Sequence, residues 1–131
     1  MKHDPGSNYE IAEALAAKSY TAGAQNSAAV DHSKLPGASY LISVGTVGSS
    51  ATVNAKVQHS PDNSTWTDEV AGAGNDTAIT EIDAAGNAQL NVPNPRARYT
   101  RVVVTVATAA CVVGVVSVAG PKLLVEPAAT T

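Results

Sequence analysis

Three histidines, His3, His32 and His59, are the residues of this sequence best suited to metal binding or acid–base chemistry. Their spacing matches no zinc motif, and no cysteine pair accompanies them. Asp31 precedes His32, but neither a Gly-x-Ser-x-Gly turn nor a glycine-rich oxyanion loop is present to complete a hydrolase site. We therefore expect no bound metal or cofactor and no enzymatic activity.

The acidic residues give no stronger indication of chemistry, because they are scattered over predicted loops and strand ends. The sequence contains neither the Asp-x-Asp-x-Asp-Gly pattern of a calcium loop nor a glycine-rich phosphate loop before a helix. A glycosidase pair would need two carboxylates facing each other across a cleft, which the sequence does not show. The residues in question are Asp62, Asp68, Glu69, Asp76, Glu81 and Asp83.

The most specific short segment is Gln58 to Asp68, which contains a dense cluster of turn residues. Ser60 and Asp62 can accept hydrogen bonds from backbone N–H groups of the turn, and the intervening proline fixes φ. Trp66 is the only tryptophan, and we expect it to cover one end of the core. The alternative is an exposed Trp66 that stacks on a sugar ring.

The composition fits one domain with a core of small aliphatic side chains. The chain has 131 residues, 44% of them hydrophobic, and no phenylalanine. Only 15% of residues are charged and the net charge is −3, which argues against nucleic-acid binding. A surface this poor in charge is either covered by neighbouring proteins or kept soluble by Ser, Thr and Asn. Cys111, the only cysteine, is expected to be a buried, unreactive thiol.

Nothing in the sequence predicts an association with membranes. The first residues, 1–6, lack the apolar centre of a signal peptide. The longest apolar stretch, 102–118, is too short and too rich in β-branched residues for a membrane helix.

Short strands separated by turns dominate residues 25–120. Residues 51–58 alternate apolar and polar side chains, whereas the valine-rich segments 98–107 and 111–119 are apolar on both faces. The short connections 45–50 and 108–109 predict hairpins. We expect an all-β fold, an antiparallel β-sandwich or jelly-roll-like domain of seven to eight strands. The predicted strands are 38–44, 51–58, 65–68, 76–82, 88–92, 98–107 and 111–119.

The two ends of the chain differ from this domain. Residues 1–24 read as an N-terminal arm, in which 9–18 is a weak helix because Ile11 and Leu15 are four apart and alanine is frequent. Residues 121–131 read as a C-terminal tail. We expect both ends to contact other proteins, through Tyr9, Ile11, Leu15, Leu123, Leu124 and Val125.

Several segments together resemble small head proteins of tailed bacteriophages. They are Val30-Asp31, the strand 40–45, the run 57–68 with Asp62 and Trp66, the run Arg98 to Val102 with Tyr99, and the last valine-rich strand. The resemblance covers about residues 28–120. It places Asp62, Trp66 and Tyr99 among turn and core positions.

The resemblance implies a capsid decoration (cement) protein, which stabilises a shell by bridging its subunits. The implied partner is the major capsid protein, and the implied location is the exterior of the virion, after synthesis in the host bacterial cytoplasm. A homo-oligomer, such as a trimer formed through 102–118, would fit this role. The alternatives are a glycan-binding or adhesion module on a virion surface, and another head–tail structural component.

Overall fold

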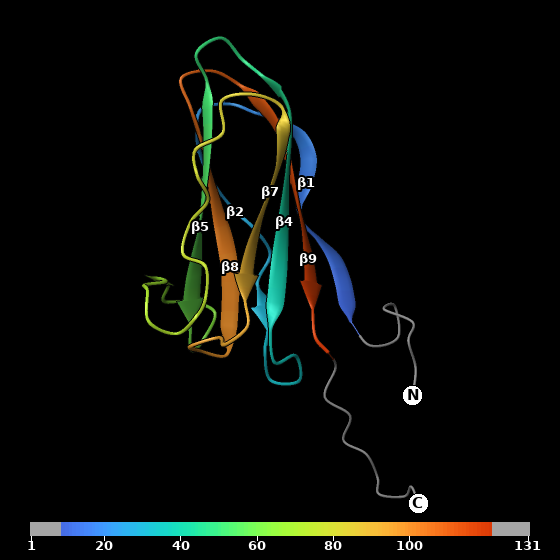
Figure 1. Ribbon diagram of the computed structural model, residues 1–131, viewed down its shortest axis with the longest axis vertical. Coiled ribbons are helices and arrows are strands. Elements are labelled where there is room, and N and C mark those ends of the chain that lie inside the picture. The colour runs from blue at the N-terminus through green and yellow to red at the C-terminus, as the bar shows by residue number, and fades with distance from the viewer. Residues whose placement is uncertain (1–8, 122–131) are drawn as a thin grey trace, which may run out of the picture.

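The computed structural model describes residues 9–121, which form a β-sandwich without helices in this part of the chain (Figure 1). The four-stranded sheet has the order β1-β9-β4-β7, and the five-stranded sheet has the order β2-β8-β5-β6 with β3 also paired to β8. All strand pairs are antiparallel. The predicted fold class is therefore confirmed. The strands are β1 (Glu10–Tyr20), β2 (Gly23–Asn26), β3 (Val30–Asp31), β4 (Ala38–Val47), β5 (Thr52–Ser60), β6 (Thr67–Asp68), β7 (Gly86–Val92), β8 (Tyr99–Ala107) and β9 (Cys111–Ala119).

The core lies between the two sheets and is built from alternate residues of the long strands. In β4 the side chains of Tyr40, Ile42 and Val44 are buried, whereas Leu41 and Ser43 between them are exposed. This alternation is what the two-residue period of a strand requires when one face is covered. The facing sheet contributes mainly valines, so the sandwich is filled by small branched side chains, as the composition predicted. These facing valines are Val53, Val57, Val102, Val104 and Val106.

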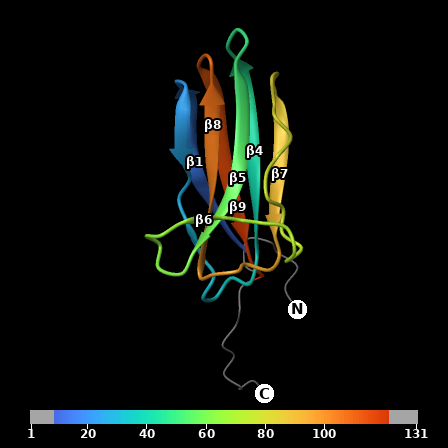
Figure 2. The same cartoon turned by 90° about the vertical axis from the view of Figure 1, so that its left-hand side faces the viewer.

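The prediction that neighbouring strands form hairpins is wrong at two connections. β4 belongs to the four-stranded sheet and β5 to the five-stranded sheet, so 48–51 carries the chain across the sandwich. The turn at 108–110 does the same between β8 and β9, and Thr108 there adopts a positive φ of 76°. The two valine-rich strands are therefore stacked in different layers rather than paired side by side (Figure 2).

The predicted helix over residues 9–18 is also wrong. This segment is β1, which pairs with β9 from Glu10↔Ala119 to Tyr20↔Cys111. Two irregularities in the register, one on each side of Leu15, interrupt the alternation that would have marked a strand. From Glu10 onward the segment is therefore an edge strand of the sandwich, and residues 10–24 are not a separate arm.

Residues 76–82 were predicted to be a strand but form only two isolated bridges with β5, Val53↔Ile82 and Lys56↔Ala78. The segment runs beside β5 and covers part of its edge (Figure 1). Its backbone bonds to β5 include Ile79 N–H to the Ala55 carbonyl at 3.0 Å. The predicted strand 88–92 is present and begins two residues earlier, at Gly86.

Candidate protein-binding face

The outer face of the four-stranded sheet carries most of the large apolar side chains that the described residues leave exposed. Ile11, Leu41, Val112 and Val116 are 57%, 40%, 37% and 38% exposed, and of the exposed large hydrophobic residues only Val70 lies elsewhere. Leu41 is directly opposite Val116 in the register, and Ile11 is opposite Val118. These four side chains therefore lie on one face, across β1, β9 and β4, and we call this set the outer patch.

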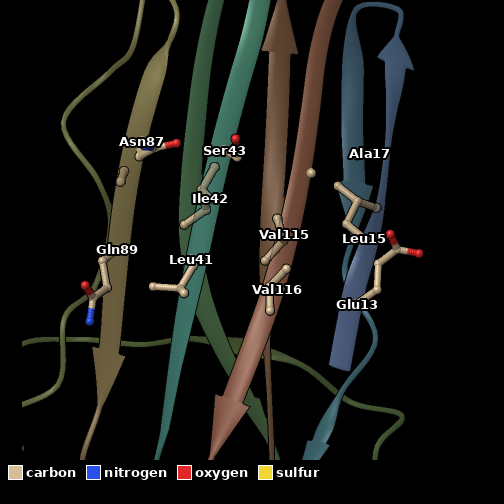
Figure 3. Close-up of a pocket in the computed structure, with 12 residues that line it drawn as sticks. Glu13, Leu15, Ala17, Leu41, Ile42, Ser43, Asn87, Gln89, Val115 and Val116 are labelled. Atoms are coloured by element: carbon tan, nitrogen blue, oxygen red, sulfur yellow. The ribbon is translucent and has the colours of Figure 1, made fainter. Parts of the chain in front are cut away.

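An open groove of about 600 Å³ crosses this face (Figure 3). Its walls come from all four strands of the sheet, so the groove depends on the strand order and not on one segment of sequence. An open apolar groove of this kind can accommodate side chains of another protein. The lining residues are Glu13, Leu15, Ala17, Leu41, Ile42, Ser43, Asn87, Ala88, Gln89, Gly114, Val115 and Val116.

A close approach of two strands shapes the groove at Gly114. A Cβ atom added there would lie 2.8 Å from the Ala17 Cβ and 3.1 Å from the Ala17 Cα. A glycine on β9 therefore lets the irregular part of β1 lie against it. Because Gly114 has no side chain, nothing projects from this position into the groove.

The groove contains little charge. Among the described residues, Glu13 is the only ionisable one in its lining, and the remaining polar groups are the Ser43 hydroxyl and the side-chain amides of Asn87 and Gln89. Covering such a surface removes few charges from water, so the desolvation penalty of binding is small. The depletion of charge at the centre of a patch is characteristic of protein–protein contacts.

The outer face of the five-stranded sheet has the opposite character. Lys56 forms a 3.1 Å ion pair with Asp68, and Asp68 also accepts a hydrogen bond from the Gln58 amide at 2.8 Å. These bonds to Gln58 and Lys56 lower the pKa of Asp68. Arg101 donates to the Gln58 side-chain oxygen at 2.9 Å, which links two strands through a polar network. The two faces of the sandwich are thus chemically distinct.

The expected core position of Trp66 is wrong. Its side chain is only half-buried and lies next to β6, where the Arg101 guanidinium is 4.2 Å from the ring centre. Arg101 belongs to the outer face of β8, as does Tyr99, which is also half-buried. Trp66 and Tyr99 therefore lie outside the valine core.

The turn chemistry predicted for Ser60 and Asp62 is confirmed. The Asp62 carboxylate accepts the N–H groups of Ser64 and Thr65, both at 2.9 Å, and the Ser60 hydroxyl at 2.9 Å. The Thr65 and Ser60 bonds are the main cause of the lowered pKa of Asp62. The Asp62 carboxylate thus makes these hydrogen bonds with residues of its own turn.

The contact residues predicted at the N-terminal end have different environments. Ile11 lies exposed on the outer patch, whereas Leu15 is buried at 9% exposure. Tyr9 lines a second groove of about 460 Å³ at the end of the sheet, together with Pro36, Pro93 and Pro121. Leu123, Leu124 and Val125 lie outside the described residues.

Leu41 was missed as a contact residue, whereas Val112 and Val116 lie within 102–118, the segment expected to form a homo-oligomer. The sequence signal for the two valines was the doubly apolar pattern of β9, which was attributed to burial of both faces. Nothing in the sequence alone shows that one of these faces is open. That depends on β9 lying inside a sheet over which residues 9–121 form no third layer.

A buried carboxylate, Glu69, organises the long loop between β6 and β7. It accepts hydrogen bonds from Arg96 Nε at 2.7 Å and Asn75 at 3.1 Å, and its other oxygen lies 3.0 Å from His59 Nδ1. Burial raises the pKa of Glu69, but the bonds from Arg96, Asn75 and His59 together with the charge of Arg96 outweigh it, so the pKa is lowered. The cluster joins the loop after β6 to β5 through His59 and to the loop after β7 through Arg96.

A second polar cluster, formed by His32, Thr100 and Tyr40, lies at one end of the core. His32 Nδ1 lies 2.7 Å from the Leu35 carbonyl, so this nitrogen carries the proton. Nε2 then accepts from the Thr100 hydroxyl at 2.7 Å, and the Tyr40 hydroxyl lies 2.8 Å from Thr100. Asp31 forms no dyad with His32, since its carboxylate pairs with Arg98 at 3.0 and 2.9 Å. The cluster is a structural one that fixes the end of the sandwich.

Among residues 9–121, no group of three or more His, Cys, Asp or Glu side chains is arranged to hold a metal ion. Within the same range, no helix is long and apolar enough to cross a membrane. The sequence matches no protein-family model and no curated protein among those compared with it. The function must therefore be inferred from the surfaces of the molecule.

Proposed function

We propose that this chain is a structural protein that decorates and stabilises the capsid of a tailed bacteriophage by binding neighbouring subunits of the major capsid protein. The single observation that carries the binding role is the outer patch, where Leu41 and Val116 lie opposite each other and Val112 is exposed on the same weakly charged sheet face. The resemblance of residues 28–120 to phage head proteins supplies the choice of partner.

The physical argument for stabilisation rests on mass action. A protein that binds only the assembled shell lowers the free energy of that shell relative to its free subunits. A flat face such as the outer patch can lie across the boundary between two subunits, where it buries apolar area that neither subunit covers alone. We expect this chain to bind assembled shells and not isolated subunits.

The test is co-sedimentation with capsids assembled from the major capsid protein of the same phage. Leu41→Glu and Val116→Glu each place a negative charge in the centre of the outer patch. Each should weaken binding at least about tenfold, because the added carboxylate must be buried without a cationic partner, and at position 116 it also faces Glu13. Thr105→Glu is the matched control, since Thr105 is exposed on the other sheet. Equal binding by all three variants would refute the proposed face.

A second candidate function is glycan binding, favoured by the position of Trp66 outside the core. Its ring is half-buried with Arg101 over one side, and hydrogen-bonding groups of Gln58 and Asp68 lie nearby on the same sheet. Sugars commonly stack on such rings. Titration of capsular or lipopolysaccharide-derived oligosaccharides tests this role, followed by Trp66 fluorescence in the wild type and by isothermal titration calorimetry in the wild type and the variants. Weakening by Trp66→Ala with no effect of Leu41→Glu would support it over capsid binding.

A third role, another head–tail component, makes a different prediction about location. Gold labelling of the chain in electron micrographs of intact particles should mark the capsid exterior. Label confined to the neck or tail would exclude decoration while leaving a structural role in place.

A further inference from the structure

The four outer edges of the two sheets are protected to different degrees. Exposed strand edges pair readily with other strands, so proteins shorten, charge, distort or cover them. In this molecule β2 and β6 are short, and the edge of β5 beyond β6 is covered by residues 76–82. β1 carries three charged side chains, Glu10, Glu13 and Lys18, and two register irregularities.

The edge of β7 lacks most of these protections. Its sequence, Gly-Asn-Ala-Gln-Leu-Asn-Val, contains no charge and no proline, and its pairing with β4 is regular over all seven residues. β7 lies at the side of the sandwich opposite β1 (Figure 2). Of the four sheet edges, this one is the best suited to pair with another strand.

The backbone direction along β7 follows from Asn91. Its carbonyl accepts the Asp76 N–H at 2.9 Å, and its N–H donates to the Asp76 carboxylate at 2.8 Å, so both groups point away from β4. In an antiparallel strand the same orientation recurs at every second residue. The N–H and carbonyl groups of Gln89 and Asn87 therefore point outward too, and no loop backbone group in the described part of the chain bonds to them.

We infer that β7 pairs with β7 of a second copy of this chain, in antiparallel register about a twofold axis at Ala88. This register makes Asn87 and Gln89 of each copy a hydrogen-bonded pair with Gln89 and Asn87 of the partner subunit, each pair exchanging two backbone bonds. The four-stranded sheets of both copies then join into one continuous sheet. The inference stands independently of the proposed function.

The chemistry of β7 favours a second copy over an unrelated chain. Near a twofold axis each residue meets itself or its close neighbours, so any charge there would face a like charge. β7 has none, and its exposed side chains are amides, which both donate and accept hydrogen bonds and are therefore self-complementary. Ala88 would face its own copy at the narrow, non-hydrogen-bonded position, where a small side chain fits.

Sedimentation velocity of the full chain at about 100 µM, well above a weak dissociation constant, tests the inference. The wild-type chain should sediment as a dimer. Gln89→Pro removes the outward N–H of residue 89 in each copy without touching the pairing to β4, and should weaken dimerisation at least about tenfold. A wild-type chain that is monomeric at this concentration, or a Gln89→Pro dimer of unchanged affinity, would overturn the inference.

A charge-swap experiment tests the register itself. One variant carries Asn87→Lys with Gln89→Lys, and the other Asn87→Glu with Gln89→Glu, so each opposes like charges when it pairs with itself. Each variant alone should be monomeric, and an equimolar mixture should recover the dimer. Ala12→Lys with Ser19→Lys on β1 is the matched control and should remain dimeric. Failure of the mixture to associate, or loss of the dimer in the β1 control, would exclude the β7 register; circular dichroism verifies that each variant is folded.

Discussion

The guanidinium group of Arg101 lies 4.2 Å from the centre of the Trp66 ring. Arg101 is held in this place by its hydrogen bond to the Gln58 side chain at 2.9 Å. The contact joins the short strand β6 and the turn before it to the outer face of β8. One side of the only tryptophan is thereby shielded from water by a cation instead of by the core.

Removing this cation should expose the tryptophan. We expect Arg101→Ala to increase acrylamide quenching of Trp66 fluorescence and to lower the free energy of unfolding by about 1 kcal/mol, the usual size of a partly exposed cation–π contact. Lys56→Ala is the control, because it removes another cation from the same face. If quenching rises equally in both variants, the shielding does not come from Arg101.

The Glu69 cluster should be a major source of stability for the loop between β6 and β7. Glu69→Ala leaves Asn75 and Arg96 without their carboxylate partner, and we expect a loss of about 2–3 kcal/mol in urea unfolding. This is below the value for a fully buried pair, because a third of the Arg96 side chain is exposed.

The control for this variant is Asp68→Ala, which breaks the exposed ion pair with Lys56 and should cost about 0.5 kcal/mol. Hydrogen exchange should accelerate in residues 70–76 of Glu69→Ala only. A loss as small as that of the control would show that Glu69 does not hold the loop.

His32 should make the fold less stable in mild acid. Burial lowers the pKa of His32, so the folded state favours the neutral ring more than the unfolded state does. Its contribution is complete above the ordinary histidine pKa, about 6.5, and is lost as the pH falls from there through the lower pKa of the folded state. Urea unfolding of the wild type should therefore show stability that falls as the pH is lowered from about 6.5 to 5.5.

His32→Gln should flatten this part of the pH profile, although it lowers stability at pH 8 by removing the bonds to Leu35 and Thr100. The comparison isolates His32, because the other two histidines are present in both proteins. An unchanged slope in His32→Gln would assign the acid sensitivity to another group.

Gly114 should be sensitive to the addition of a single methyl group. Gly114→Ala would bring a Cβ to within 2.8 Å of Ala17 Cβ, so β1 must move, at a cost of about 1–3 kcal/mol. Gly86→Ala is the control, because no atom lies within 4 Å of the added Cβ. Thermal unfolding of both variants checks the difference, and similar melting temperatures would mean that β1 and β9 are not tightly packed there.

The strand content was predictable from the sequence because turn residues and alternating side chains mark most strands locally. β5 is the clearest case, with Val53, Ala55 and Val57 buried and polar residues between them. β1 was mistaken for a helix because its register irregularities remove this alternation, while alanines and the Ile11–Leu15 spacing suit a helix equally well. The segment is a strand because it pairs with β9, more than 90 residues away in the chain.

The outer patch could not be predicted for a similar reason. A valine at position 112 or 116 has the same local pattern whether or not another layer covers it. The decisive information is that β8 and β9 belong to different sheets. The short turn between them suggests a hairpin within one sheet instead. The turn at Ser60 and Asp62, in contrast, depends only on neighbours in sequence, and it was predicted correctly.

The position of β9 between β1 and β4 has a consequence for synthesis of the protein. Of the described strands, β9 leaves the ribosome last, yet it occupies the interior of its sheet. Until it emerges, β1 has no partner strand, and the edge of β4 that later pairs with β9 is also unpaired. The four-stranded sheet, and with it the outer patch, therefore comes into existence only after translation has passed residue 119.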